Sequence, residues 1–352
     1  MIDSPIKPSA VEIDRFDKVL LTLPDDVRRI VTTFDPSDLT EIRMVYGYPL
    51  TLAFGSQLVR CDGVESEHEL MMTREHVKNC KDALGGFEDD GRAGIDGTLH
   101  RYSEVPNRFN VTLGIVVRLA RAYLGSSDAL AGPFTPEQVV PIVHSGGRED
   151  KVTNLDDMLG DPSFSFCTIG KPNTRKTTLL RDITRKSSIP VAEGGYGLGQ
   201  FCVLVDSSNE NGGFGDLPHP AIGHALRIQV GDPKYQAHKI QIAIRNLSAK
   251  RLIVDEIGYN NDVDQIQSCA NLGVGVICTL HGDNVGDAID NKTYWPLFGM
   301  VDRQTKAGKV AFRACLELHA PDRWVLYPNL SQAVSAILAG TPPMGIKIGS
   351  GW

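Results

Sequence analysis

The sequence lacks several features that would each define a class of protein. It has no excess of basic residues, since 36 Lys and Arg stand against 43 Asp and Glu, a formal net charge of −7. This balance argues against a general nucleic-acid coat, which carries a basic surface. The seven cysteines include no C-x-x-C pair, so neither a zinc ribbon nor a disulfide scaffold is predicted. We expect buried free thiols in a reducing compartment.

Long apolar runs are also missing. None approaches the ~20 residues that a membrane-spanning helix needs. The N-terminus has no apolar signal core and is not rich in Arg and Ser, as a transit peptide would be. These absences predict a soluble, unexported chain in the cytoplasm. With 352 residues, 41% of them apolar, the chain can bury a sizeable core and suggests about two domains.

Hydrophobic patterning divides the chain into two parts. In the first, helical spacing and short strand-like runs bounded by Gly and Pro indicate a small α+β domain. From Phe164 onward, short apolar strands alternate with helical stretches, which predicts an α/β domain with a mostly parallel sheet covered on both faces. We therefore predict an N-terminal domain over residues 1–135, a linker over 136–162 and the second domain over 163–345.

One apolar strand of the second domain is followed by a phosphate-loop pattern. Residues 170–178 read Gly-Lys-Pro-Asn-Thr-Arg-Lys-Thr-Thr and precede a helical stretch. The amides of such a loop and of the helix N-terminus face a bound anion. By this spacing, Lys176 reaches the β- and γ-phosphates of a nucleotide, and Thr177 places its hydroxyl on Mg²⁺. We assign the other loop residues to nucleotide binding: Gly170, Asn173, Thr174, Arg175 and Thr178.

Arg175 departs from this pattern, which has glycine before the lysine. Glycine is favoured there because the backbone approaches the phosphates closely and adopts a conformation that a Cβ opposes. Two interpretations stay open. Either Arg175 obstructs the nucleotide, or its guanidinium turns outward and adds positive charge.

Polar side chains follow three further apolar strands of the same domain. Asp255 and Glu256 end one of them; such an aspartate holds Mg²⁺ through water, and such a glutamate polarises the attacking water as general base. Asp206 and Glu210 follow another strand, and His281, a candidate sensor of the γ-phosphate, follows the third. Because the carboxyl ends of parallel strands meet in one crevice, we expect a single site for ATP and Mg²⁺.

These motifs, in this order, resemble stage III sporulation protein AA and related P-loop proteins of cyanobacteria and plastids. The resemblance extends from Leu23 to Gly340 and rests on several separate runs: residues 90–101, 177–183, 205–210, 218–223, 254–258 and 279–282.

The resemblance implies a RecA/AAA-like P-loop NTPase core, akin to the ATPases of type IV pili and of type II and type IV secretion. It implies a homo-oligomeric ring, usually a hexamer, with ATP at subunit boundaries, and a membrane-complex partner protein that the motor energises. For a chain from a photosynthetic lineage, it also implies a location in the plastid stroma instead of the cytoplasm. By the same analogy, Asp206 and Glu210 form an acidic box and His281 belongs to a histidine box. Arg118 and Arg121 of the N-terminal domain would reach phosphate in cis or across a subunit interface.

The chain departs from the family at positions that bear on hydrolysis. Fewer arginines precede Arg227, which leaves it as the candidate arginine finger, and Tyr259-Asn260 replaces an acidic residue. The leading hypothesis is a Mg²⁺-dependent ATPase in which Glu256, assisted by Glu210, orients water and the arginines neutralise transition-state charge. One alternative is a nucleotide-binding switch that turns over little ATP because of Arg175.

A second alternative, which we do not favour, is a nucleic-acid-associated ATPase. It rests on a locally basic set in the N-terminal domain: Arg92, His100, Arg101, Arg108, Arg118 and Arg121. These charges are more simply explained as facing solvent or neighbouring subunits.

Overall fold

The structure is a computed structural model that describes residues 14–132, 140–143, 149–152, 154–172, 174–258 and 260–349. The chain forms two compact units. The smaller unit contains the described residues up to Ala122 together with Gly213–His219. The larger unit contains Tyr123–Gly212 and the described residues from Pro220 onward.

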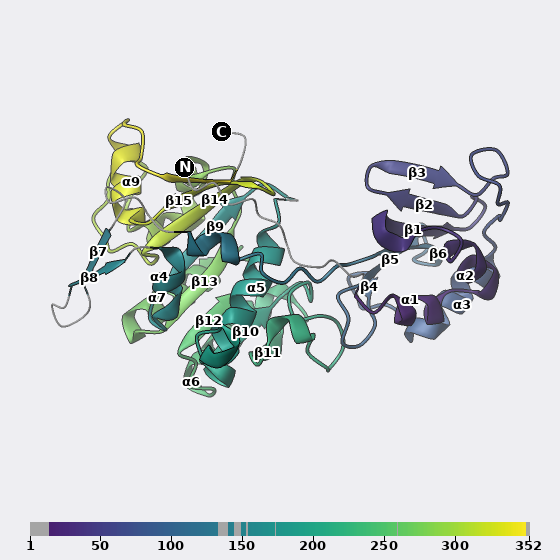
Figure 1. The fold of residues 1–352 in the computed structure, drawn as a ribbon, viewed down its shortest axis with the longest axis horizontal. Coiled ribbons are helices and arrows are strands. Elements are labelled where there is room, and N and C mark those ends of the chain that lie inside the picture. Colours follow the sequence, from purple (N-terminus) through teal and green to yellow (C-terminus); the bar gives the residue numbers. More distant parts are fainter. Residues whose placement is uncertain are drawn as a thin grey trace. The chain divides into compact units, whose positions relative to one another are not determined.

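The smaller unit is an antiparallel sheet with helices packed on one face (Figure 1). Its strand order is β3-β2-β1-β6-β5-β4. Alternate apolar residues of the central strands, such as Ile42 and Val117, are fully buried in one core with Val27 and Val77 of the helices. The alternation in the sequence reflects this one-sided burial. The elements are α1 (Phe16–Thr22), α2 (Asp25–Val31), β1 (Leu39–Val45), β2 (Thr51–Phe54), β3 (Gln57–Arg60), α3 (Arg74–Leu84), β4 (Arg92–Ala93), β5 (Arg101–Pro106) and β6 (Thr112–Arg118).

The larger unit is built on an eight-stranded sheet of order β11-β10-β12-β13-β9-β14-β15-β16. The strands from β11 to β14 in this order run parallel, and β15 and β16 complete the sheet in antiparallel fashion. The predicted mostly parallel sheet is therefore confirmed. Its strands are β9 (Phe166–Gly170), β10 (Cys202–Asp206), β11 (Leu226–Gln229), β12 (Arg251–Val254), β13 (Gly275–Leu280), β14 (Ala314–Ala320), β15 (Arg323–Tyr327) and β16 (Ile346–Gly349).

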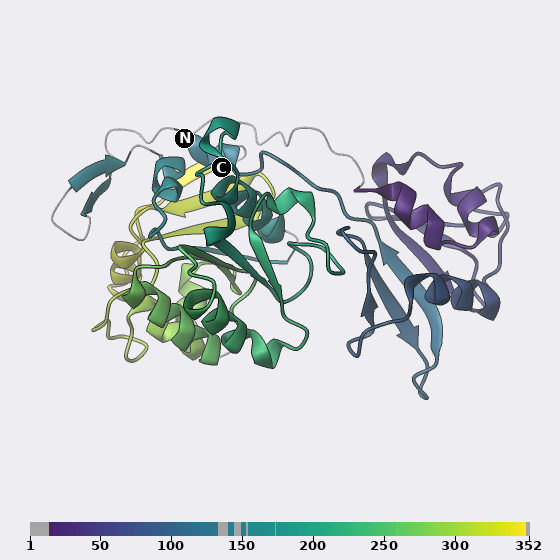
Figure 2. The ribbon, with the colours of Figure 1, turned by 90° about the horizontal axis from the view of Figure 1, so that it is seen from below.

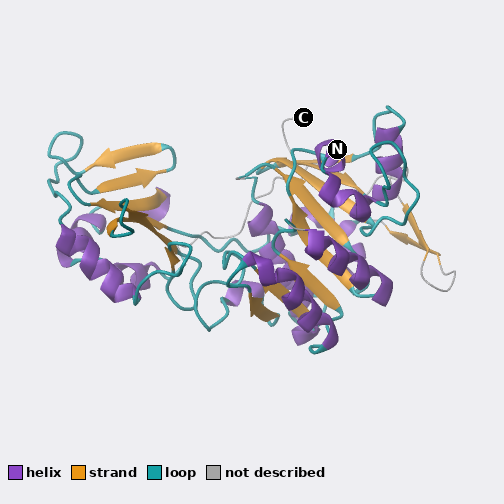
Figure 3. Ribbon diagram, turned by 180° about the vertical axis from the view of Figure 1, so that it is seen from behind, coloured by secondary structure: helices purple, strands orange, loops and turns teal. Residues whose placement is uncertain are grey.

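Helices cover both faces of this sheet (Figures 2 and 3). On one face, α6 and α7 pack against residues such as Leu252 and Val254; on the other, α5 packs against Ile253. Successive residues of β12 thus face opposite cores, which is why its sequence is continuously apolar instead of alternating. The helices are α4 (Leu155–Gly160), α5 (Lys176–Ser188), α6 (Gln236–Arg245), α7 (Asn260–Leu272), α8 (Val285–Asp290) and α9 (Leu330–Leu338).

The described residues of the expected linker, 136–162, are structured. Strands β7 (Val140–Val143) and β8 (Glu149–Val152) form an antiparallel hairpin, and α4 follows them. Leu155, Met158 and Leu159 of α4 are buried in the same core as α5, as their helical spacing allows. This helix is therefore a part of the larger unit rather than a free connection.

A short segment in the middle of the larger unit's sequence belongs to the smaller unit. Residues 213–219, which we call the strap, leave the larger unit and belong to the smaller one. Phe214 bridges Asp96 in parallel fashion, and its N–H donates to the Thr98 carbonyl at 2.9 Å. The Phe214 ring is 3% exposed and packs on Gly94, where any Cβ would collide with it. A division into consecutive segments could not anticipate this insertion, because its partners are far away in the sequence.

Two further expectations concern thiols and membranes. All seven cysteines are buried free thiols, as predicted. Within the part of the chain that the structure describes, no helix combines the length and the apolar character that crossing a bilayer requires.

We predict that Phe214→Ala lowers the free energy of unfolding of the smaller unit by about 3 kcal/mol, because it removes a buried ring and leaves a cavity against Gly94. Urea denaturation followed by circular dichroism measures this. Leu217→Ala in the same strap is the matched control, since Leu217 is 62% exposed. Equal effects of the two substitutions would contradict the packing described for the strap.

Candidate functional site

Four parallel strands end at one edge of the larger sheet. In spatial order β10, β12, β13 and β9, they lead into Asp206, Asp255, His281 and the loop after Gly170. Because neighbouring strands are in parallel register, these ends lie side by side. This edge is where ligands bind in open α/β sheets.

The loop between β9 and α5 has the course of a phosphate-binding loop. A Cβ on Gly170 would lie 2.7 Å from the Leu318 carbonyl and 2.8 Å from the Thr174 hydroxyl, so the chain needs glycine there. The Thr174 hydroxyl donates to the Lys171 carbonyl at 2.8 Å and closes the loop. Helix α5 begins at Lys176, which places Thr177 and Thr178 in its first turn. Asn173 lies outside the described residues.

Lys176 points back over this loop. Its ammonium donates to the carbonyls of Gly170 and, at 2.8 Å, of Lys171. Partial burial lowers the pKa of Lys176, and the negative charges of Glu256 and Asp255 partly offset that effect. The lysine and both carboxylates therefore share one electrostatic environment, as a P-loop site requires.

Arg175 retains the backbone conformation for which glycine is favoured. Its φ of 71° and ψ of 24° lie in the left-handed region, which costs a non-glycine residue about 1–2 kcal/mol. Its guanidinium lies over the ring of Tyr123, 5.5 Å from the centroid. The left-handed main-chain conformation at this position is thus reached with an arginine, whose side chain has an aromatic partner.

Asp255 and Asp206 form a buried acidic pair. Asp255 accepts hydrogen bonds from the Ser208 hydroxyl and, at 2.5 Å, from the side-chain amide of Asn211. Burial and the negative charge of Asp206 raise the pKa of Asp255 to about 7. Burial also raises the pKa of Asp206, although the N–H of Gly212 donates to its Oδ2 at 2.7 Å. Within the described ranges, its buried Oδ1 has no hydrogen-bond partner.

This acidic pair fits the environment of Mg²⁺. Carboxylate and hydroxyl oxygens are the ligands that Mg²⁺ prefers, and it is usually held by one or two carboxylates together with substrate phosphates. Asp255, the unsatisfied Oδ1 of Asp206 and the hydroxyl of Thr177 supply such oxygens. Among the residues that the structure describes, no group of three or more His, Cys, Asp and Glu could hold a metal by itself. A cation here would therefore depend on the nucleotide as well.

Glu256 Oε1 and His281 Nε2 are in contact between two neighbouring strand ends. Their side chains are 43% and 59% exposed, so the carboxylate is accessible to water. Two residues that the sequence did not single out support them. The side-chain amide of Gln236 donates to the Glu256 carbonyl at 2.7 Å, and the Tyr294 hydroxyl donates to the Ile257 carbonyl at 2.9 Å. No motif would have identified these two residues.

Two arginines hold the acidic loop that follows β10. Arg181 of α5, which the sequence reasoning missed, donates to the carbonyls of Glu210 at 2.5 Å and Asn211 at 3.2 Å. Arg227 of β11 donates to the Gly212 carbonyl at 2.9 Å. The positive charges of both arginines oppose the rise in the pKa of Asp206. The role of Arg227 as an arginine finger stays a prediction.

Arg118 and Arg121 lie in the smaller unit and have partners there. Arg118 donates to the Glu41 carboxylate at 3.2 Å. Arg121 donates to three main-chain carbonyls around the start of β1, among them Leu39 at 2.9 Å. Other members of the basic set are also engaged, since Arg92 pairs with Asp90 at 3.5 Å and His100 is fully buried. The reach of Arg118 and Arg121 toward phosphate stays a prediction.

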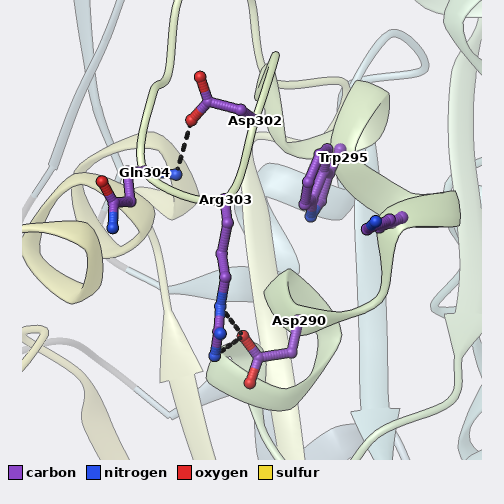
Figure 4. Close-up of a pocket in the computed structure, with 6 residues that line it drawn as sticks. Asp290, Trp295, Asp302, Arg303 and Gln304 are labelled. Atoms are coloured by element: carbon purple, nitrogen blue, oxygen red, sulfur yellow. Dashed lines mark hydrogen bonds and ion pairs between the residues drawn. The ribbon is translucent and has the colours of Figure 1, made fainter.

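A separate cavity of about 570 Å³ in the larger unit contains none of these residues (Figure 4). Arg303 lies across it and pairs with Asp290 at 2.9 Å. The residues that line it are Asp290, Lys292, Trp295, Asp302, Arg303 and Gln304.

Comparison with known proteins agrees with the motifs. Residues 161–304 match the family model described as sporulation stage III, protein AA. Stage III sporulation protein AA of Bacillus subtilis is 36% identical over 126 residues, which cover 34% of this chain and 38% of that protein. The predicted resemblance is confirmed.

Longer matches come from photosynthetic organisms. A ycf45 protein of Porphyra purpurea is 29% identical over 75% of this chain and 44% of its own length. The Arabidopsis thaliana protein SEEDLING PLASTID DEVELOPMENT 1 is 28% identical over 95% of this chain and 45% of its own length. This chain therefore spans less than half the length of these two relatives.

Solved structures show the same fold. The pilus retraction motor PilT with bound ADP matches with a TM-score of 0.55 at 11% identity, covering 90% of each chain. The ATPase DotB of Yersinia pseudotuberculosis matches with a TM-score of 0.53 at 12% identity, covering 96% of this chain and 87% of that one. The chain thus has the predicted P-loop ATPase fold, which it shares with these two proteins.

We predict that Asp255→Asn stabilises the protein at pH 8, without nucleotide or Mg²⁺, by about 2–4 kcal/mol. The folded-state pKa of about 7 exceeds the ordinary value of 3.8, so the folded protein binds more protons between these pH values. The contribution of this carboxyl group to the free energy of unfolding is therefore complete below pH 4 and is lost as the pH rises through about 7. The amide of asparagine carries no charge at either pH and so avoids this loss. Thermal unfolding at pH 4.5 and pH 8 measures it, with the exposed Asp216→Asn as control. A gain of equal size at both pH values would refute the assignment.

Proposed function

We propose that this chain binds ATP with Mg²⁺ and hydrolyses it as a subunit of a secretion-ATPase-like motor. The observation that carries the proposal is the position of Lys176, whose ammonium lies within electrostatic range of Asp255 and Glu256. Strand β13 lies between β9, which leads to Lys176, and β12, which leads to the two carboxylates. A phosphate-loop lysine that faces two carboxylates at the same edge of the sheet is the arrangement that phosphoryl transfer from ATP uses. The relatives and the shared fold support this proposal at the level of the ATPase class.

Each group has a role that its surroundings support. Lys176 leaves the loop carbonyls to bind the β- and γ-phosphates, and the amides of the loop face the same anion. Thr177 and Asp255 would hold Mg²⁺, which neutralises charge on the phosphate oxygens. Glu256 is accessible to water and takes its proton as general base. His281, which follows the neighbouring strand β13, contacts the Glu256 carboxylate and orients it.

We further propose a homo-oligomeric ring, with a hexamer as the expected state, that energises an assembly or transport process through a membrane-complex partner. The resemblance to motor ATPases supports this assembly. Light scattering with and without ATP and Mg²⁺ tests it, and a monomer under both conditions would refute the ring.

We predict that Lys176→Ala lowers ATP turnover at least about 100-fold and weakens ATP binding, because it removes the cation that faces the phosphates. Equilibrium dialysis and release of radiolabelled phosphate measure the two effects. The exposed Lys309→Ala is the matched control and should change neither. Unaltered turnover in Lys176→Ala would remove the basis of the proposed site.

We predict that Glu256→Gln lowers turnover about 10²- to 10⁴-fold, the usual contribution of a general base, while ATP binding changes by less than about threefold. The exposed Glu193→Gln serves as control. The exposed residue 193 should show no such loss of turnover when its carboxylate is removed.

The second candidate function is the nucleotide-binding switch. It replaces the ATPase proposal if the unmodified protein binds ATP but releases phosphate no faster than Lys176→Ala. One observation favours it: the loop carbonyls engage Lys176, and His281 engages Glu256.

A further inference from the structure

Arg175 combines a strained backbone with an ordered side-chain contact. Its left-handed conformation would be free of strain in a glycine, and the phosphate-loop pattern has glycine there. Strain of this kind persists where the surrounding structure over-determines it and often marks a functional position. The contact that an arginine adds here is the one between its guanidinium and the ring of Tyr123.

Tyr123 begins the segment through which the chain enters the larger unit. The smaller unit ends at Ala122, and we call residues 123–131 the connector. The connector is held on α5, the helix that follows the phosphate loop. The N–H groups of Gly125 and Ser127 donate to the two carboxylate oxygens of Asp182 at 3.1 Å and 2.8 Å, and the Ser127 hydroxyl donates at 2.5 Å.

Asp182 is suited to a rigid attachment because it is fully buried. Its carboxylate also accepts from Arg185 one turn further along α5, at 2.9 Å. Further along the connector, Leu130 is 1% exposed and belongs to the same core as Leu179 and Ile183 of α5. The connector is therefore fixed to the body of α5. Its first residue, Tyr123, instead contacts Arg175, which immediately precedes this helix and belongs to the phosphate loop.

We propose that Arg175 couples occupancy of the phosphate loop to the connector. The inference rests on the proposed nucleotide binding. Phosphates in the loop offer the guanidinium an anionic partner, and charge-assisted hydrogen bonds to phosphate are stronger than this half-buried cation–ring contact. Arg175 therefore leaves Tyr123 when a nucleotide binds. The start of the connector, ahead of its attachment to Asp182, is then released where the chain leads to the smaller unit. Arg175 acts here as a positioning residue.

Hydrogen exchange in the full-length chain tests this coupling, with Mg²⁺ and ADP as the probe. The amides of Gly125 and Ser127 are suitable reporters, because their N–H groups donate to Asp182 and hold the start of the connector on α5. We expect saturating ADP to raise their exchange rates about two- to fivefold, the factor that the loss of one cation–ring contact allows. The amides of α5 should become more protected in the same experiment.

Variants separate the contact from general effects on folding. Arg175→Gly should bind ADP and lose the response of the connector, whereas Tyr123→Phe, which keeps the ring, should retain it. Arg175→Lys, which keeps a cation, should retain at least part of it. Arg108→Gly is the matched control, because it removes another arginine–ring contact, that of Arg108 with Phe109, in the smaller unit. Circular dichroism confirms that each variant is folded.

The outcomes distinguish this inference from the proposed function. Equilibrium dialysis measures ADP binding independently of exchange. A wild-type chain that does not bind ADP would overturn the proposed function and the coupling with it. Binding without any change at Gly125 and Ser127, or an unchanged response in Arg175→Gly, would overturn the coupling and leave the nucleotide site intact.

Discussion

The burial of two neighbouring carboxylates is the constraint on which the acidic side of the candidate site depends. Asp206 and Asp255 lie at the ends of adjacent strands, and burial in a medium of low dielectric penalises a negative charge on both of them. Hydrogen bonds from Ser208, Asn211 and the Gly212 amide offset a part of this penalty. The remaining penalty grows as the pH rises through about 7, where Asp255 loses its proton. Positive charge beside this pair would lower the penalty.

The same pair explains why the acidic loop is so firmly held. Arg181 and Arg227 donate to three consecutive carbonyls of this loop, at residues 210–212, and bring positive charge near Asp206. The loop then continues directly into the strap at Gly213. A rearrangement of the acidic pair on cation binding would therefore act on a segment whose next residues are built into the smaller unit. This continuity is covalent and does not depend on the placement of the two units.

The sequence was sufficient for those parts of the molecule in which short-range patterns decide the structure. Continuous apolar strands predicted the parallel sheet. The spacing of Gly170 and Lys176 predicted a phosphate loop after one strand, and Asp255 was expected at the same edge of the sheet because it follows another. The strap and the supporting residues Gln236 and Tyr294 could not be predicted in this way. Their roles depend on contacts between distant segments, such as Phe214 with Gly94, which leave no periodic signal. Arg181 is similar, since a buried arginine within a helix has no motif until the loop that it binds is placed beside it.

Arg175 shows how a departure from a motif can preserve the structure that the motif encodes. The function of glycine in the loop is to permit a backbone conformation, and the chain reaches this conformation with an arginine at a cost of about 1–2 kcal/mol. A phosphate loop is therefore recognised more reliably by the conformation of its main chain than by the residue types of the motif. Because a glycine would remove the strain, the arginine is better explained by what its side chain contacts than by tolerance of the position. The ring of Tyr123 is that contact, and it links the last residue before α5 to the start of the connector.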